Sequence, residues 1–351
     1  MNTCLSLAQL GWRNFFQTQL SFEELESFYP VRISEQHKNQ YHYLSTDGEG
    51  ILPIQPSMPA LAVGDWVLLD DEGRFNRMLE RQSYFSRKAS GSKVHEQSIA
   101  SNVDTVFIVA SLNNDFNLNR IERYLALVHE AQSEPVLVLT KADLCDDVDQ
   151  YLEPLRKIDH HLNIEVVNAL DASTLNGLMT WCKSGQTVAL LGSSGVGKST
   201  LVNTLRGLSG NDEQASLTQG IREDDSKGRH TTTSRQLHFL PHGGLFLDTP
   251  GMRELQLADC EDGLQQTFSD ITELAKGCRF SDCQHQSEPG CAVNQAIEDG
   301  QLELRRLQSY HKLMKEQAIN SATLAERRAQ DRDLGKFYKH TQKEMRALKG
   351  Q

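Results

Sequence analysis

The sequence has no apolar run that approaches the roughly 20 residues of a membrane-spanning helix. Its first residues, MNTCLSLAQLGWRNFF, lack the basic leader and apolar core of a secretory signal. It also lacks a positive net charge. The formal charge of −11 argues against nonspecific coating of nucleic acid, although a local basic face stays open. From these absences we expect a cytoplasmic protein with no membrane contact.

Cysteine is scarce outside one short segment. Four of the seven cysteines are scattered, and in a reducing cytosol we expect them to be plain thiols. The segment CRFSDCQHQSEPGC holds Cys278, Cys283, His285 and Cys291, spaced C-x4-C-x-H-x5-C. Three thiolates and one imidazole make a closed tetrahedral zinc set, so one structural zinc ion is expected. Free thiols, a disulfide and a catalytic zinc are the alternatives, and the last lacks an open coordination position.

The chain of 351 residues is longer than one hydrophobic core usually spans, so two or three domains are expected. Residues 1–36 indicate one or two short helices and a connector. Residues 37–97 alternate apolar and polar residues around Asp-Gly and Glu-Gly turns, which predicts a small all-β domain, barrel or sandwich. The end of this range, SRKASGSKVHEQ at 86–97, is aperiodic and predicts a loop or linker.

From residue 103 the pattern becomes α/β. The short apolar runs VDTVFIVASL, PVLVLT, NIEVVNA, TVALLG and GLFLDTP are typical of strands buried on both faces. Between the first two lies NLNRIERYLALVHEAQ, with apolar residues at helical spacing. This alternation predicts a parallel sheet with right-handed crossovers. Residues 263–275 are expected to be helical. Most of the chain from 294 onward is also expected to be helical, and it ends in a basic tail.

The segment GSSGVGKS satisfies G-x-x-x-x-G-K-[ST], directly after the strand TVALL and before a helical stretch. Its glycines let successive backbone N–H groups point at phosphate oxygens. Lys198 is expected to reach the β- and γ-phosphates, and Ser199 to hold Mg²⁺. The alternative is a plain Gly/Ser-rich turn before a helix. The predicted phosphate loop comprises Gly192, Ser193, Ser194, Gly195, Val196, Gly197, Lys198, Ser199 and Thr200.

Another strand ends in FLDTPG, where Asp248 is placed to hold Mg²⁺ through water and Gly251 to offer its N–H to the γ-phosphate. Alone, this tetrapeptide is also ordinary turn chemistry. Between it and the phosphate loop lies the polar, aperiodic segment 222–236. We expect a switch loop there, in which Thr231, Thr232 or Thr233 closes onto Mg²⁺, with a bland surface loop as the alternative.

The strand PVLVL ends in TKAD. The carboxylate of Asp143 can accept both N–H donors of the guanine edge, which adenine lacks, and the stem of Lys141 is expected to lie across the base. Thr140 stands where such motifs usually carry Asn. NAL at 168–170 is the candidate backbone contact to the base. A polar loop after a strand is the alternative.

The motifs stand in an unusual order, with the base reader at 140 and 168 and the phosphate segments at 192 and 248. Each ends its own strand, and ligands bind at the carboxyl ends of strands in an open sheet. The two termini of a domain usually lie close together. Linking them and opening the chain at another loop changes the order of the motifs but leaves the site intact. The order is therefore a circular permutation of the usual one.

Hydrolysis of a bound nucleoside triphosphate needs a group that orients the attacking water. In Ras-like proteins this group is a glutamine directly after the motif that corresponds to DTPG, but here that position is Met252. His230, in the expected switch loop, is the nearest candidate because an imidazole can position water near neutral pH. The alternative is that Lys198 or a bound RNA does this work.

Together these residues resemble the circularly permuted, ribosome small-subunit-dependent GTPases (the RsgA or YjeQ family). The resemblance covers residues 37–320. It implies an N-terminal extension at 1–36, an OB-fold RNA-binding domain at 37–97, a circularly permuted P-loop GTPase domain at 98–262 and a zinc-binding helical domain with basic tail at 263–351. It also implies a monomer that binds GTP and GDP with Mg²⁺, contacts the 30S subunit and its 16S rRNA, and acts in late 30S maturation with subunit-stimulated hydrolysis.

Two other functions stay open from sequence. A P-loop ATPase or small-molecule kinase is disfavoured by Asp143 and by the absence of an obvious arginine cluster for a substrate phosphate. A nonhydrolysing RNA-binding module, with nucleotide as a fold ligand only, would bind GTP without turnover. The tail from Ser321 to Gln351 carries eight Lys/Arg and four Asp/Glu, so an RNA contact and a solvated face are both open.

Overall fold

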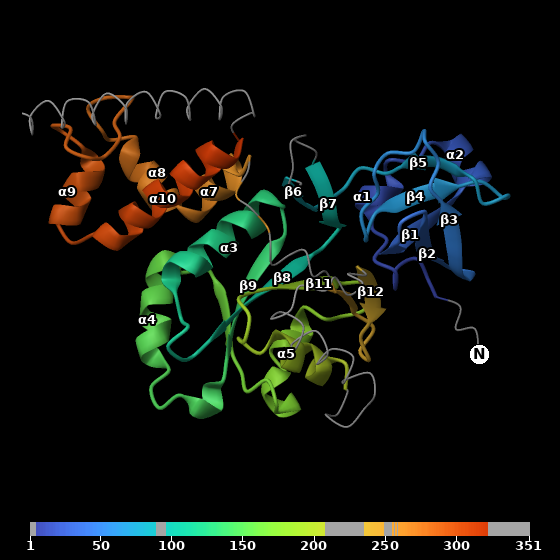
Figure 1. Ribbon diagram of the computed structural model, residues 1–351, viewed down its shortest axis with the longest axis horizontal. Coiled ribbons are helices and arrows are strands. Elements are labelled where there is room, and N and C mark those ends of the chain that lie inside the picture. Colours follow the sequence, from blue (N-terminus) through green and yellow to red (C-terminus); the bar gives the residue numbers. More distant parts are fainter. Residues whose placement is uncertain are drawn as a thin grey trace, which may run out of the picture. The chain divides into compact units, whose positions relative to one another are not determined.

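The computed structural model describes residues 5–88, 96–207, 235–248, 255, 257 and 259–321 (Figure 1). The chain divides into two compact units. The first comprises Met1–Ser86, Ser98–Leu255 and Asp262–Ser269, and the second comprises Arg87–Gln97, Gln256–Glu261 and Asp270–Gln351. Within the described ranges, no helix is both long and apolar enough to cross a membrane.

The first unit begins with two short helices, α1 (Asn14–Gln17) and α2 (Phe22–Ser27). Helix α2 starts with a capping box, because the Ser21 hydroxyl accepts from the Glu24 backbone and the Glu24 carboxylate accepts from the Ser21 backbone. The short helices match the expectation, but the predicted connector after them is wrong. Residues Tyr29–Gln36 form strand β1, whose partners lie downstream and so leave no local signal.

Five antiparallel strands follow the order β5-β4-β1-β2-β3. The hairpins β2–β3 and β4–β5 turn at the Asp-Gly and Glu-Gly positions that the alternating pattern predicted. Their inner faces pack a core of Val31, Ile33, Tyr41, Leu52, Leu61, Val67 and Leu69. The remaining bounds are β2 (Gln40–Ser45), β3 (Gly48–Pro53), β4 (Trp66–Leu69) and β5 (Phe75–Met78).

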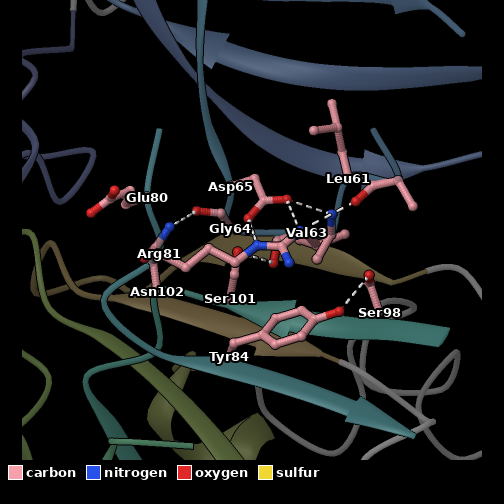
Figure 2. Close-up of polar contacts among 12 residues, drawn as sticks. Leu61, Val63, Gly64, Asp65, Glu80, Arg81, Tyr84, Ser98, Ser101 and Asn102 are labelled. Atoms are coloured by element: carbon pink, nitrogen blue, oxygen red, sulfur yellow. Dashed lines mark hydrogen bonds and ion pairs between the residues drawn. The ribbon is translucent and has the colours of Figure 1, made fainter. Parts of the chain in front are cut away.

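Two polar networks join this β part to the chain that leads into the α/β part of the same unit. In Figure 2, the carboxylate of Asp65 accepts from Arg81, whose guanidinium lies 4.1 Å from the centre of the Tyr84 ring. Nearby, the fully buried Arg32 donates to the carbonyls of Leu10, Gly64 and Asn102. Burial lowers the pKa of Arg32 to about 10, so it stays protonated at neutral pH.

The α/β part contains the five predicted strands, in the parallel order β10-β9-β8-β11-β13. All residues of β8 are buried, as a strand covered on both faces requires. Helix α3 packs on β8 and β9, and α5 adds Leu201, Val202 and Leu205 to the core on the other face (Figure 1). The bounds are β8 (Thr105–Ser111), β9 (Glu134–Thr140), β10 (Asn163–Val166), β11 (Thr187–Leu191), β13 (Leu245–Asp248), α3 (Leu118–Glu130), α4 (Asp149–Ile158) and α5 (Lys198–Leu205).

A parallel sheet was predicted, but the observed sheet is mixed. Strand β12 (Gln236–Phe239) runs antiparallel to β13 and pairs on its other side with β1, at Glu35 and Gln236. The predicted loop at 86–97 is also wrong in part, because β6 (Tyr84–Lys88) and β7 (Glu96–Ser101) form a two-stranded sheet. These strands are short and polar, so only their partners identify them.

The second unit includes Arg87–Gln97, which holds parts of β6 and β7, and its regular elements in the described residues from Asp270 onward are helices, as predicted. They are α8 (Ser269–Ala275), α9 (Ala292–Glu298) and α10 (Leu304–Ser321), preceded by α7 (Glu261–Thr267). The buried guanidinium of Arg306 binds the carboxylate of Asp270 through two nitrogens, at 2.8 and 2.9 Å, and so holds α10 on α8. The expected basic tail lies outside the described residues.

Candidate functional site

The glycine-rich loop lies between the end of β11 and the start of α5. Gly192 has φ of +148°, and a Cβ there would meet the carbonyl oxygen of Val109 at 2.4 Å. Gly197 caps α5 with φ of +93°, a left-handed conformation that favours glycine. The loop therefore has the tight wrap that aims backbone N–H groups at an anion ahead of a helix N-terminus.

Lys198 lies within this loop, and its side chain is buried in the first turn of α5. Its Nζ donates to the carbonyl oxygen of Gly192 at 2.7 Å and also contacts the carbonyl oxygen of Ser193. Ser199 and Thr200 follow on the same first turn. The predicted phosphate residues thus form one continuous loop and helix start.

The TKAD segment lies at the end of β9, beside the loop. Thr140 is fully buried, and its hydroxyl contacts the carbonyl oxygens of Val196 at 2.6 Å and Ala110 at 3.3 Å. Lys141 follows with φ of 62°, in the left-handed region, and turns the chain so that Asp143 is exposed on the short helix Ala142–Leu144. The structure thus brings the predicted base reader and phosphate loop together at one edge of the sheet.

The candidate base-contact segment NAL, together with the preceding residue Val167, meets both other segments. The hydroxyl of Thr204 on α5 donates to the carbonyl oxygen of Ala169 at 2.7 Å. On the other side, the N–H of Ala142 donates to the carbonyl oxygen of Val167 at 3.3 Å. The Asn168 side chain accepts from the N–H of Leu170 at 3.0 Å, which fixes the turn. Three strand ends therefore form a single loop cluster, as strand ends in an open parallel sheet do.

One contact to the phosphate loop was missed by the sequence analysis. Arg120, in the first turn of α3, contacts the hydroxyl of Ser193 and pairs with Asp115 at 2.9 Å. The Ser193 hydroxyl also donates to Asp115, at 3.2 Å. The Arg120 hydrogen bond lowers the pKa of Asp115 below its usual value. The only available signal was a charged pair directly after the end of strand β8.

Asp248 ends β13, which runs parallel to β11 and so brings this carboxylate to the same edge as the phosphate loop. Asp248 also lies opposite Gln236 of β12. The other predicted magnesium and switch residues, Thr231, Thr232 and Gly251, lie outside the described residues, as does His230. Their predicted roles are therefore unaffected by the geometry of the described part of the chain.

The predicted metal ligands converge in the second unit. Sγ of Cys278 lies 3.9 Å from Sγ of Cys291 and 3.6 Å from Nδ1 of His285, and the Cys291–His285 distance is 3.4 Å. All four candidate ligand atoms, Sγ of Cys283 included, lie within 4.8 Å of one another. A tetrahedral zinc ion with ordinary bond lengths separates two sulfurs by about 3.8 Å and sulfur from nitrogen by about 3.6 Å. The donor set therefore fits zinc.

The surrounding backbone prepares this cluster. Cys291 caps α9, and its Sγ accepts from the N–H of Asn294 at 3.4 Å. Burial opposes ionisation of Cys278, but N–H groups at the start of α9 hold the pKa of this thiol below its usual value. Burial, then the charge of His311, lowers the pKa of His285, which favours the neutral imidazole that metals bind. Both effects favour metal-binding protonation states.

The loop that carries His285 is held by a carboxylate. The side chain of Glu288 accepts from the backbone N–H groups of Gln284, Gln286 and Ser287 at 2.9, 2.8 and 3.0 Å. These hydrogen bonds, that of Gln284 foremost, lower the pKa of Glu288 to about 2. His285 itself has φ of 57°, so the loop fixes this ligand in a conformation that is unusual for histidine.

Known proteins are similar to this chain over most of its length. The family model described as RsgA GTPase matches residues 78–258. The small ribosomal subunit biogenesis GTPase RsgA 2 of Vibrio parahaemolyticus is 56% identical over 346 residues, which cover 99% of this chain and 95% of that protein. The small ribosomal subunit biogenesis GTPase RsgA of Mesorhizobium japonicum is 45% identical over 319 residues, covering 90% and 91%.

Solved structures support the fold. The crystal structure of YjeQ from Thermotoga maritima has a TM-score of 0.61 at 24% identity, and covers 82% of this chain and 98% of that one. The structure of YloQ, described as a circularly permuted GTPase, has a TM-score of 0.60 at 24% identity, and covers 84% and 97%. At such identity these structures bear on the fold alone. The family predicted from motif order is confirmed, and the chain belongs to the RsgA GTPase family.

Proposed function

We propose that this protein is a GTPase that acts in late maturation of the small ribosomal (30S) subunit and hydrolyses GTP with stimulation by that subunit. The observation that carries the nucleotide part is the hydrogen bond from Thr140 to Val196, which unites the base reader with the phosphate loop. The ribosomal part rests on the relatives, whose names describe small-subunit biogenesis GTPases along nearly the whole chain.

In the proposed site, each segment has one task. The exposed carboxylate of Asp143 accepts the two guanine N–H donors, while the stem of Lys141 covers the base. The loop 192–199 donates backbone N–H groups to the phosphates, and Lys198 exchanges its carbonyl contacts for the β- and γ-phosphate oxygens. Guanine is thereby selected by hydrogen bonds, and the phosphates by charge and backbone shape.

Magnesium fits the same edge. Ser199 lies in the first turn of α5, which follows β11, and Asp248 ends β13, the parallel strand next to β11. Hydroxyl and carboxylate oxygens are ligands that Mg²⁺ accepts together with phosphate oxygens. When bound, this ion neutralises charge that develops on the phosphate oxygens. Thr231 or Thr232 and the Gly251 N–H are proposed to close on the γ-phosphate.

Water orientation is assigned to His230. Met252 has neither a donor nor a useful acceptor at the position where Ras-like proteins carry glutamine. An imidazole can accept a hydrogen bond from water near neutral pH, and His230 belongs to the segment expected to order on the subunit. An ordered loop then supplies part of the acceleration that activating partners give, up to roughly 10⁵-fold.

The rest of the chain is proposed to bind RNA. We assign an OB-fold RNA-binding domain to 37–97 together with strand β1, an N-terminal extension to the residues before β1, the permuted GTPase domain to 98–262, and a helical domain with one structural zinc ion and a basic tail to 263–351. OB-folds bind oligonucleotides. The sequence of the tail has an excess of positive charge, which would attract the phosphates of 16S rRNA. We further propose a cytoplasmic monomer.

The test is GTP turnover of the purified protein titrated with purified 30S subunits. We expect slow turnover alone, a saturable increase with 30S subunits, and a much smaller increase with 50S subunits. ATP should neither compete for binding nor be hydrolysed. Lys198→Ala should remove turnover, and His230→Ala should retain GTP affinity but lose the stimulated rate. Turnover that does not respond to 30S subunits would reject the proposed function, and an unaffected His230→Ala would reject that role alone.

A further inference from the structure

Three side chains with metal-binding atoms gather on the β1–β2 hairpin of the first unit, apart from the cysteine cluster. Nε2 of His37 lies 2.9 Å from Oε2 of Glu35, and Nδ1 of His42 lies 3.8 Å from the same oxygen. The two imidazole rings are 4.5 Å apart between centroids. One candidate ligand atom from each residue lies within 4.8 Å of the others. No proposed GTPase step uses these residues.

The hairpin itself brings the three side chains together. The register between β1 and β2 shifts between Ile33 and Glu35, so that Glu35 lies directly opposite His42. Such a bulge turns the side chains beyond it away from the face that the strand otherwise follows. His37 comes two residues after Glu35, and its N–H donates to the carbonyl oxygen of Gln40 at 2.9 Å, which closes the turn.

Neighbouring side chains hold two of the three ligands in place. The amide of Gln236 on β12 contacts Oε1 of Glu35, which leaves Oε2 toward the histidines. The Gln40 amide lies 2.9 Å from Nε2 of His42. The atom placed there is the Gln40 amide nitrogen, which donates to Nε2. Metal binding through Nδ1 requires this amide to turn by 180°, so that Nε2–H of His42 donates to the Gln40 oxygen and Nδ1 carries the free lone pair. Metal-bound histidines almost always have such a partner on the second ring nitrogen.

A surface ion pair between Glu35 and His37 would not account for the position of His42 in this cluster. Glu35 is within hydrogen-bond distance of His37 but not of the His42 Nδ1, at 3.8 Å. A tetrahedral zinc ion with bonds of about 2.0–2.1 Å separates its nitrogen and oxygen ligands by about 3.3 Å. The two observed separations bracket that value, so small side-chain rotations place all three atoms around one ion. Imidazole and carboxylate together suit Zn²⁺, Ni²⁺ and Cu²⁺.

We propose that Glu35, His37 and His42 form a second metal site, which binds a divalent transition metal ion such as Zn²⁺. Three protein ligands leave coordination positions for water or a ligand from a partner, unlike the closed cysteine site. Because the other carboxylate oxygen of Glu35 contacts Gln236, a bound ion also fixes the pairing of β1 with β12.

The test uses untagged full-length protein dialysed to equilibrium against Zn²⁺, with bound metal measured by atomic emission. Two equivalents are expected, one of which resists brief treatment with a weak chelator. His37→Gln with His42→Gln should bind one equivalent. The matched control is His160→Gln with His161→Gln, an exposed histidine pair in a loop, which should still bind two. A single equivalent in wild type, or equal zinc in all three proteins, overturns the proposal.

A conservative series separates ligation from folding. Gln40→Ala removes no ligand but takes away the partner of His42, so the second Zn²⁺ should bind about 10- to 100-fold more weakly. GTP affinity and circular dichroism should match wild type in each variant. Unchanged affinity for the second Zn²⁺ in both Gln40→Ala and His42→Gln would show that the bound ion lies elsewhere.

Discussion

The hydroxyl of Thr140 lies 2.6 Å from the carbonyl oxygen of Val196, a residue fifty-six positions further along the chain. The first belongs to the base-reading segment and the second to the phosphate loop. Because Thr140 is fully buried, water does not replace this hydrogen bond. A threonine thus makes the link between the two loops at a position where such motifs usually carry asparagine.

Thr140→Val should therefore weaken GTP binding. The variant keeps the shape of the side chain but leaves the Val196 carbonyl without its donor. The cost of such a buried group is about 1–3 kcal/mol, or roughly 5- to 150-fold, shared between folding and GTP affinity. Calorimetric titration and thermal unfolding measure the two shares. Thr187→Val is the control, since the buried Thr187 hydroxyl has no hydrogen-bond partner within the described ranges; equal effects of the two changes would refute this role.

Asp143→Asn should exchange base specificity. An amide offers one acceptor and one donor in place of two acceptors, which mismatches guanine but matches xanthine. We expect weaker GTP binding and stronger binding of xanthosine triphosphate, measured by competition. Asp146→Asn, in the same exposed loop, should change neither. Equal GTP and ATP affinities in the wild type would remove the basis of this assignment.

Arg120→Ala should also reduce GTP affinity. It removes the guanidinium beside Ser193 and leaves the carboxylate of Asp115 next to the loop that binds phosphates. Repulsion between like charges then opposes binding. Arg120→Ala with Asp115→Asn should recover part of the loss, a result that simple loss of packing does not predict. The control Arg156→Ala changes an exposed arginine on α4.

Cys283→Ser should release the metal and loosen the second unit. Structural zinc contributes about 10–16 kcal/mol in small peptides, more than a short loop between helices can replace. We expect no bound zinc at the cysteine cluster, faster proteolysis near residues 278–291 and unchanged nucleotide affinity. Cys145→Ser, a free cysteine outside the cluster, should behave like wild type. If wild-type protein that is purified without a chelator contains no zinc, the assignment is contradicted.

Acid should selectively weaken the contact between α2 and β5. Hydrogen bonds from Arg77, and then from the Ser21 backbone, lower the pKa of Glu24 from 4.5 to about 2. Since the folded pKa is the lower one, Glu24 stabilises the fold fully above pH 4.5 and loses this effect as the pH falls toward 2. Glu24→Gln should lower the free energy of unfolding at neutral pH, with a difference from wild type that shrinks across this window. A pH-independent difference would disprove the linkage.

Sequence alone predicted the parts whose signals are local. The buried strands around Phe107 and Val138 are continuous apolar runs, and the loop 192–199 combines glycines with one lysine in a fixed pattern. Strand β12, by contrast, has only four residues and exists because β13 and β1 lie on either side of it. Arg120 was missed for the same reason, since its contact at Ser193 is seventy-three residues away.

The tie between Thr140 and Val196 also has a meaning for synthesis. Chains are made from the N-terminus, so β8, β9 and β10 emerge before the strand that separates β8 from β13. The base-reading segment is therefore translated first, and the Thr140 hydroxyl can form its hydrogen bond only after Val196 has been synthesised. Nascent chains that end before residue 199 lack the phosphate loop and therefore the complete nucleotide site, so GTP can stabilise only chains that extend past the middle of the 351-residue sequence.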